Sequence, residues 1–225
     1  MWDCHLADEV QRHLQAIKDF RQLSLSEFKT VVKKLDVKIA ILGGGEPTLD
    51  EELPDAIDLL NGLDIETRLL TNSHILNEKF IEKLEKVELS NTCISIKAYD
   101  DSIHRFYTGQ TNKSVLDNFR LLAKSRINLM VESVLIPGLI EPDEIERIAR
   151  FIASINPSIP FRIDGFIPIH DVPWRRPSPK EVIKATQIAK RHLENVYNIH
   201  SDTEQKGQAI NIYPIIKNDN LVPHH

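Results

Sequence analysis

The stretch Val37-Lys-Ile-Ala-Ile-Leu-Gly-Gly-Gly-Glu-Pro-Thr48 decides the expected fold, because a short apolar run passes directly into three glycines. Such a run, ended by turn residues, is typical of a strand buried on both faces of a parallel sheet. Glycines that follow the strand let the backbone approach a ligand closely. The stretch therefore predicts a ligand-binding loop, with a simple tight turn into the next helix as the alternative.

The alternation of strand and helix continues along the chain. Apolar runs predict further strands at 66–71, 93–97, 128–136 and 161–169, and a weak one at 210–216. Helical spacing predicts helices at 50–60, 77–86, 114–124, 142–155 and 179–195. Successive strand–helix units with right-handed connections form a parallel sheet with helices outside it. The sequence thus predicts an α/β fold, a partial (β/α)6-type parallel barrel.

The two ends of the chain differ from this pattern. Apolar residues at helical spacing over 7–23, and a second helix from Ser26, whose hydroxyl is suited to cap it, predict a helical start over residues 1–36. Residues 201–225 read as a C-terminal tail that begins with a polar loop. No repeat or linker divides the chain, so we expect one domain over residues 1–225.

The composition excludes several classes of function. The 225 residues are 41% hydrophobic, enough to bury a core, and a formal net charge of -5 gives no general attraction for nucleic acid or anionic lipid. No apolar stretch suits a membrane span or a secretory signal. Two cysteines cannot form a disulfide framework and suit a reducing compartment. We expect a cytoplasmic protein whose partners are small molecules or proteins.

Residues able to bind ligands follow the predicted strands. Because the carboxyl ends of parallel strands meet at one edge of a sheet, these residues are expected to converge on one site. They are Gly43, Gly44, Gly45, Glu46, Thr71, Asn72, Ser73, His74, Ser95, Lys97, Glu132, Ser133, Asp164 and His170. A lysine inside an apolar strand is unfavourable unless it is paired, which favours a role for Lys97. The glycines match neither the phosphate-loop nor the dinucleotide fingerprint.

The run from Gly43 to Thr48 resembles the Gly-Gly-Glu-Pro motif of radical S-adenosylmethionine (radical SAM) enzymes, which also follows an early strand. Residues 95–100, together with His104 and the Thr108-Gly109 pair, resemble a strand region of the glycyl-radical-enzyme activases. Residues 135–140 (LIPGLI) and 166–170 (FIPIH) extend the similarity in order. The sequence therefore looks like a radical SAM protein, most similar to the pyruvate formate-lyase activating enzymes.

The resemblance implies two cofactors, S-adenosylmethionine and a 4Fe-4S cluster held by three cysteines. In this family the reduced cluster cleaves S-adenosylmethionine, and the resulting 5'-deoxyadenosyl radical abstracts hydrogen from a substrate; in activases the substrate is a glycine of a partner glycyl radical enzyme. The resemblance assigns these residues to S-adenosylmethionine: Gly44, Gly45 and Glu46 to the methionine amino group, Thr71 and Asn72 near the ribose, Lys97 to the methionine carboxylate or ribose, and His170 to the adenosine end.

Three positions depart from the activase pattern. Ser95 and Leu70 stand where the activases have acids, and Glu132 stands where they have an arginine. Ser95 and Glu132 stay candidate cofactor-binding positions. The alternative for Glu132 is a buried ion pair with Lys97 across adjacent strands.

The cluster motif itself is incomplete. Cys4 falls where the last cysteine of the family's Cys-x3-Cys-x2-Cys loop would lie, and one cysteine cannot hold three irons. Cys93 is expected to be a small core residue. We therefore expect a chain that lacks the first barrel strand and is inactive alone, as a fragment, a late gene start or a degenerate member. The sheet edge left open would allow a dimer.

Two further functions stay open. One is a cluster-free module that binds a nucleoside or a protein, and the other is a βα-barrel hydrolase or aldolase in which Lys97 forms a Schiff base. The segment Asp171–Arg176, with Trp174 and two arginines, is interpreted either as a docking surface or as an exposed loop anchored by its tryptophan.

Overall fold

The computed structural model describes residues 23–168, 172–204, 216–217 and 220–221. Six strands form one parallel sheet in sequence order: β1 (Ile39–Leu42), β2 (Glu66–Thr71), β3 (Asn91–Ser95), β4 (Asn128–Leu135), β5 (Phe161–Gly165) and β6 (Val196–Ile199). A separate antiparallel pair joins β7 (Ile216–Lys217) and β8 (Asn220–Leu221). Each strand of this sheet pairs in parallel with the next strand in the sequence. The predicted series of βα units is therefore confirmed.

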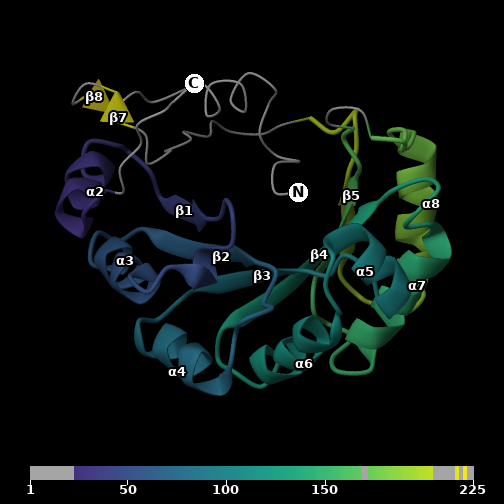
Figure 1. The fold of residues 1–225 in the computed structure, drawn as a ribbon, viewed down its shortest axis with the longest axis horizontal. Coiled ribbons are helices and arrows are strands. Elements are labelled where there is room, and N and C mark those ends of the chain that lie inside the picture. Colours follow the sequence, from purple (N-terminus) through teal and green to yellow (C-terminus); the bar gives the residue numbers. More distant parts are fainter. Residues whose placement is uncertain (1–22, 169–171, 205–215, 218–219, 222–225) are drawn as a thin grey trace.

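The helices lie along the outer side of a curved sheet (Figure 1). They are α2 (Leu25–Val32), α3 (Leu53–Asn61), α4 (Glu78–Lys86), α5 (Asp101–Thr108), α6 (Lys113–Leu122), α7 (Pro142–Ala153) and α8 (Pro179–Ala189), with a 3-10 helix η1 (Pro47–Leu49). Strands β1 and β6 are the two edges of the sheet and do not pair with each other. The α/β partial barrel predicted from the sequence is confirmed as an open, curved sheet.

The two faces of the sheet differ in chemistry because side chains alternate along each strand. Ile94, Val131 and Ile163 are fully buried and belong to the core formed with the helices. The opposite face carries Ser95, Glu132 and Arg162 side by side, since the register pairs Ser95 with Glu132 and Glu132 with Arg162. This inner face is therefore polar at β3, β4 and β5, whereas the edge strands place the exposed Ile41 and Tyr197 on it, opposite Arg68 and Arg162.

Several local expectations need correction. The third strand covers 91–95 instead of 93–97, the fifth ends at Gly165 instead of residue 169, and α5 was not predicted. The helix expected to reach residue 195 ends at Ala189. The sixth strand of the sheet is β6, which was not predicted because four residues are too few to distinguish a strand from the end of a helix. Helix α2 is capped by Ser24, not Ser26, through a capping box with Glu27. The helix expected at 7–23 and most of the strand expected at 210–216 lie outside the described residues.

Helix α8 follows the sequence expectation at its start. Ser178 caps it, Pro179 occupies its first turn, and Glu181 completes a capping box. Within the part of the chain that the structure describes, no helix combines the length and apolar character needed to cross a bilayer.

Candidate functional site

The glycine loop lies between β1 and η1, at the carboxyl end of β1. Gly44 and Gly45 have φ values of 85° and 57°, in the left-handed region that side-chain-bearing residues rarely adopt. A Cβ built on either residue meets no heavy atom within 4 Å, so the turn faces open space. The loop therefore leaves its backbone accessible from this open side, and the ligand expected there stays a prediction.

Glu46 joins this loop to the end of β2. Its Oε1 accepts bonds from the backbone N–H of Thr48 at 3.2 Å, from the Thr48 hydroxyl at 2.5 Å and from the Thr71 hydroxyl. Its Oε2 accepts one bond, from the backbone N–H of Asn72 at 2.8 Å. The structure thus brings together Glu46, Thr71 and Asn72, three of the predicted site residues, and Oε2 keeps capacity for a further donor.

The segment after β2 is fixed by short-range hydrogen bonds. The Thr71 hydroxyl accepts from the Ser73 N–H at 2.9 Å, and the Asn72 side chain accepts from the His74 N–H at 2.8 Å. Asn118 of α6 donates to the Ser73 carbonyl at 2.7 Å. Sequence reasoning missed Asn118, although a buried polar residue on the core face of a predicted helix is a usable signal.

Lys97 and Ser95 come from β3 and the residues after it. Ser95 is 8% exposed, and its hydroxyl has no hydrogen-bond partner among the described residues. Lys97 is half-buried and forms no ion pair with any described residue. A ligand could provide a partner for the buried Ser95 hydroxyl and for the half-buried Lys97 ammonium. Burial lowers the pKa of the nearby His104, and the charges of His74 and Lys97 lower it further, against a hydrogen bond to Gln110 that raises it.

Glu132 does not pair with Lys97, so that expectation is wrong. Its carboxylate instead accepts a bond from the Arg162 guanidinium, whose Nε also donates to Asp164 at 2.9 Å. The register of the strands explains why Glu132 pairs with Arg162. Arg162 is directly opposite Glu132 on β5, whereas the residue opposite Glu132 on β3 is Ser95, and Lys97 lies two residues further along the chain.

Cys93 was expected to be a small core residue, but it is half-buried on the inner face of β3, with its thiol 3.8 Å from Glu132 Oε2. Burial, and then the negative charge of Glu132, raises the pKa of this thiol far above its ordinary value. A protonated thiol is a poor metal ligand.

Two predicted site residues, Cys4 and His170, lie outside the described residues. In the part that the structure describes, no group of three or more His, Cys, Asp or Glu side chains is arranged to hold a metal ion. The whole chain has two cysteines, whereas a cluster of this family needs three. The residues present therefore do not fit a 4Fe-4S cluster.

The fold and the glycine loop define a class of protein, and a sequence profile described as the radical SAM superfamily matches residues 4–152. The chain belongs to this superfamily. It is 34% identical over 161 residues to the putative glycyl-radical enzyme activating enzyme MJ1632 of Methanocaldococcus jannaschii, covering 69% of this chain and 61% of that protein. It is 27% identical over 152 residues to the pyruvate formate-lyase-activating enzyme of Streptococcus mutans, covering 64% of this chain and 58% of that protein.

Solved structures show the same fold. A domain of the pyruvate-formate lyase-activating enzyme from Bacteroides vulgatus aligns with a TM-score of 0.61 at 23% identity, over 71% of this chain and 97% of that one. Streptococcus suis SuiB bound to S-adenosylmethionine aligns with a TM-score of 0.67 at 12% identity, over 83% of this chain and 46% of that one. The chain thus spans less than two thirds of the curated relatives named above and less than half of SuiB.

Proposed function

We propose that this chain is the S-adenosylmethionine-binding core of a radical SAM activating enzyme. The complete enzyme would cleave S-adenosylmethionine reductively to a 5'-deoxyadenosyl radical, abstract hydrogen from a glycine, and so activate a glycyl radical enzyme. The observation that carries the proposal is the open glycine turn at Gly44 and Gly45, joined by the Glu46 carboxylate to the end of β2. Similarity to activating enzymes supports the choice of branch.

The residues of this chain would bind and orient the ligand. Gly44, Gly45 and the spare capacity of Glu46 Oε2 suit an ammonium group, which needs several acceptors. Thr71 and Asn72 lie beside them because Glu46 binds both segments. This pre-organised arrangement would hold the methionine amino group and place the ribose over the end of β2.

Other groups of the inner face would act on the remaining parts of the ligand. Lys97 would provide a cation for the methionine carboxylate or the ribose, and the unpartnered Ser95 hydroxyl a hydrogen bond. Glu132 would act through Arg162 instead of binding the ligand by itself. His170 remains the proposed contact for the adenosine end.

The reductive step belongs to the complete protein in this proposal. A 4Fe-4S cluster supplies the electron in this family, and this chain lacks the thiolates to hold one. We propose that the chain alone binds ligand and is inactive in radical formation.

A second candidate, a cluster-free module that binds a nucleoside or a protein, is favoured by the same shortage of cysteines. It needs only the glycine turn and the residues around it. The two candidates predict the same ligand contacts and differ in whether the complete protein carries a cluster.

Calorimetric titration of the 225-residue chain with S-adenosylmethionine tests the proposed site. Gly44→Ala should weaken binding by about tenfold or more, because a side chain at positive φ distorts the turn. Gly109→Ala is the matched control, since Gly109 has a φ of 80° and equally open surroundings but ends α5. Absence of binding to the unaltered chain, or equal effects of both substitutions, would contradict the proposal.

A further inference from the structure

An asparagine of helix α6 holds the loop that follows β2. Asn118 is 8% exposed, and its side-chain Nδ2 donates to the Ser73 carbonyl at 2.7 Å and to the His74 carbonyl at 3.3 Å. An amide nitrogen carries two N–H groups, so one side chain can bond both carbonyls. Asn118 therefore fixes two successive peptide groups of this loop.

The loop needs this support because Ser73 has an unfavourable backbone conformation. Its φ is 56°, in the left-handed region that residues with a Cβ rarely adopt. Ser73 is fully buried, and its hydroxyl has no hydrogen-bond partner among the described residues. Thr71 and Asn72, which precede it, both bond Glu46. A change of conformation at Ser73 would therefore disturb the bonds that join this loop to the glycine loop.

A second asparagine of α6 holds the loop that follows β3. Asn112 occupies the cap position of the helix, where an asparagine side chain usually accepts a bond from the first turn, but it makes no such bond within the described helix. Its Nδ2 donates instead to the carbonyls of Ala98 at 3.3 Å and Tyr99 at 2.5 Å. These residues directly follow Lys97, so the Asn112 amide fixes the backbone next to that side chain.

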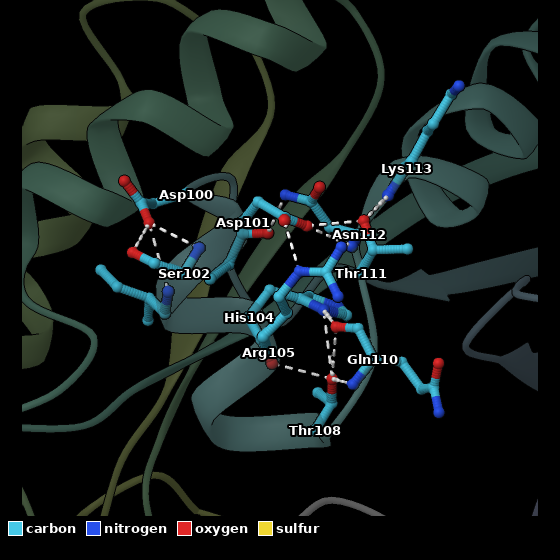
Figure 2. A network of polar contacts seen from close by, with 12 residues as sticks. Asp100, Asp101, Ser102, His104, Arg105, Thr108, Gln110, Thr111, Asn112 and Lys113 are labelled. Carbon is cyan, nitrogen blue, oxygen red and sulfur yellow. Dashed lines mark hydrogen bonds and ion pairs between the residues drawn. The ribbon is translucent and has the colours of Figure 1, made fainter.

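The backbone around Asn112 is itself fixed, as Figure 2 shows. Asp101, at the start of α5, accepts bonds from the Asn112 N–H at 3.0 Å and from the Thr111 hydroxyl at 2.6 Å. The ring Nδ1–H of His104 donates to the Gln110 carbonyl at 2.8 Å. The turn between α5 and α6 is therefore held against α5, which orients the Asn112 amide.

Helix α7 supports the same loop after β3. Glu144, which is 1% exposed, accepts bonds from the backbone N–H groups of Tyr99 at 2.6 Å and Asp100 at 2.7 Å. Its carboxylate therefore bonds N–H groups of the loop, whereas Asn112 bonds carbonyls. The loop next to Lys97 thus has supports from two helices.

We propose that Asn112 and Asn118 are positioning residues for S-adenosylmethionine. Both belong to α6, so this helix would set the distance between the loop of Asn72 and the loop that follows Lys97. The two asparagines would act through the backbone of these loops and would not touch the ligand. Loops that are ordered before binding lose less conformational entropy when the ligand binds. This inference rests on the proposed function and adds how its ligand residues are kept in place.

The chain offers a matched control at the opposite edge of the sheet. Asn61, the last residue of α3, donates its Nδ2 to the carbonyls of Val87 at 2.6 Å and Glu88 at 3.2 Å, and Glu88 has a φ of 54°. This loop precedes β3, so it lies at the amino edge, away from the glycine loop. Asn61 thus gives the same kind of support as Asn118, but to a loop without proposed ligand residues.

Calorimetric titration with S-adenosylmethionine compares these asparagines. Asn118→Ala should weaken binding by about tenfold, as the loss of one ordering hydrogen bond does. Asn112→Ala should weaken it by about threefold, because Glu144 still holds the loop. Asn61→Ala should lower the urea midpoint of unfolding, as Asn118→Ala does, and leave the affinity unchanged. Adding Ser73→Gly to Asn118→Ala should restore affinity by about threefold, because glycine adopts a positive φ without strain.

Amide hydrogen exchange, followed by NMR in the free chain, gives a readout that needs no ligand. The N–H groups of Asn72, Ser73 and His74 all bond acceptors within the site. Asn118→Ala should raise their exchange rates by about tenfold, because the loop then opens locally more often. Asn61→Ala should leave these three rates unchanged.

Three results would overturn the proposal. They are equal losses of affinity in Asn118→Ala and Asn61→Ala, unchanged exchange of the loop after β2 in Asn118→Ala, and no recovery with Ser73→Gly. If Asn118→Ala does not fold, the titration of Asn112→Ala decides, and an unchanged affinity there would count against the proposal. An unaltered chain that does not bind S-adenosylmethionine would contradict the proposed function, and amide exchange would then decide separately whether Asn118 holds the loop.

Discussion

The carboxylate of Glu46 performs two tasks with its two oxygens. Oε1 is saturated by Thr48 and Thr71, which closes the glycine loop against β2, while Oε2 bonds only the Asn72 N–H. The resemblance to a known motif assigned Glu46 to ligand binding alone. The structure adds that the same side chain holds the glycine loop against β2, so the proposed ligand binding would be coupled to local stability at this residue.

Glu46→Gln should therefore destabilise the chain. In glutamine an NH2 group, which cannot accept, replaces one of the two carboxylate oxygens. It faces either the Asn72 N–H or the hydroxyls of Thr48 and Thr71, so at least one donor now bound to Glu46 loses its acceptor. We expect a loss of about 1–3 kcal/mol in the free energy of unfolding, measured with urea. Glu52→Gln, at an exposed helix start without a side-chain capping bond, is the control and should change it by less than about 0.5 kcal/mol.

At the scale of elements, β4 and β5 are joined by charge as well as by backbone bonds. Arg162, with a side chain 22% exposed, lies between Glu132 and Asp164, and Glu132 is 3% exposed. Removing one member of such a buried set leaves its partner charged and unpaired. The effect should therefore be much larger than for an ion pair in solvent.

Arg162→Met should destabilise the chain by about 3–5 kcal/mol in urea or thermal unfolding. Arg68→Met is the matched control, because Arg68 lies on the same face of the sheet and bonds Glu66, but its side chain is 46% exposed. That control should lose about 1 kcal/mol or less. Equal losses in the two variants would show that the buried ion pairs add nothing.

The start of α8 yields a prediction about pH. Bonds from Arg175, and then from Ser178, lower the pKa of Glu181 from 4.5 to about 2. Because the pKa is lower in the folded chain, the stabilisation is complete above the unfolded value and is lost as pH falls toward 2. NMR titration of Arg175→Gln should show the Glu181 pKa raised toward 4.5. In Arg176→Gln the Glu181 pKa should stay near 2, because Arg176 forms no ion pair with any residue that the structure describes.

The elements also show what the sequence could and could not predict. Long apolar runs and the glycine stretch predicted the parallel sheet, and the motif predicted that Glu46, Thr71 and Asn72 belong together. The pattern failed where contacts distant in sequence decide the structure. Strand β6 is an example, because its four residues are too few to show the period of a strand. It also failed at Glu132, because the choice of Arg162 as partner depends on the register between strands.

On the scale of the whole molecule, the two faces of the open sheet differ in their role. The helix-covered face supplies the core, and the inner face keeps Ser95, Lys97, Glu132 and Arg162 on neighbouring strands. Because these polar groups line the inner face, the fold can bind a ligand without repacking its core.

The count of cysteines in the whole chain gives the last prediction. Three of the four irons of the family's cluster need a strong ligand from the protein, and this chain offers Cys4 and a Cys93 thiol whose pKa is raised by burial and by Glu132. Anaerobic incubation of the chain with iron and sulfide should therefore bind far less iron than one 4Fe-4S cluster and give no broad visible absorption. Cys93→Ser should behave like the unaltered chain, because a protonated thiol on the sheet does not ligate iron. A full complement of iron that disappears in Cys4→Ser would contradict this and would remove the reason for expecting the chain alone to be inactive.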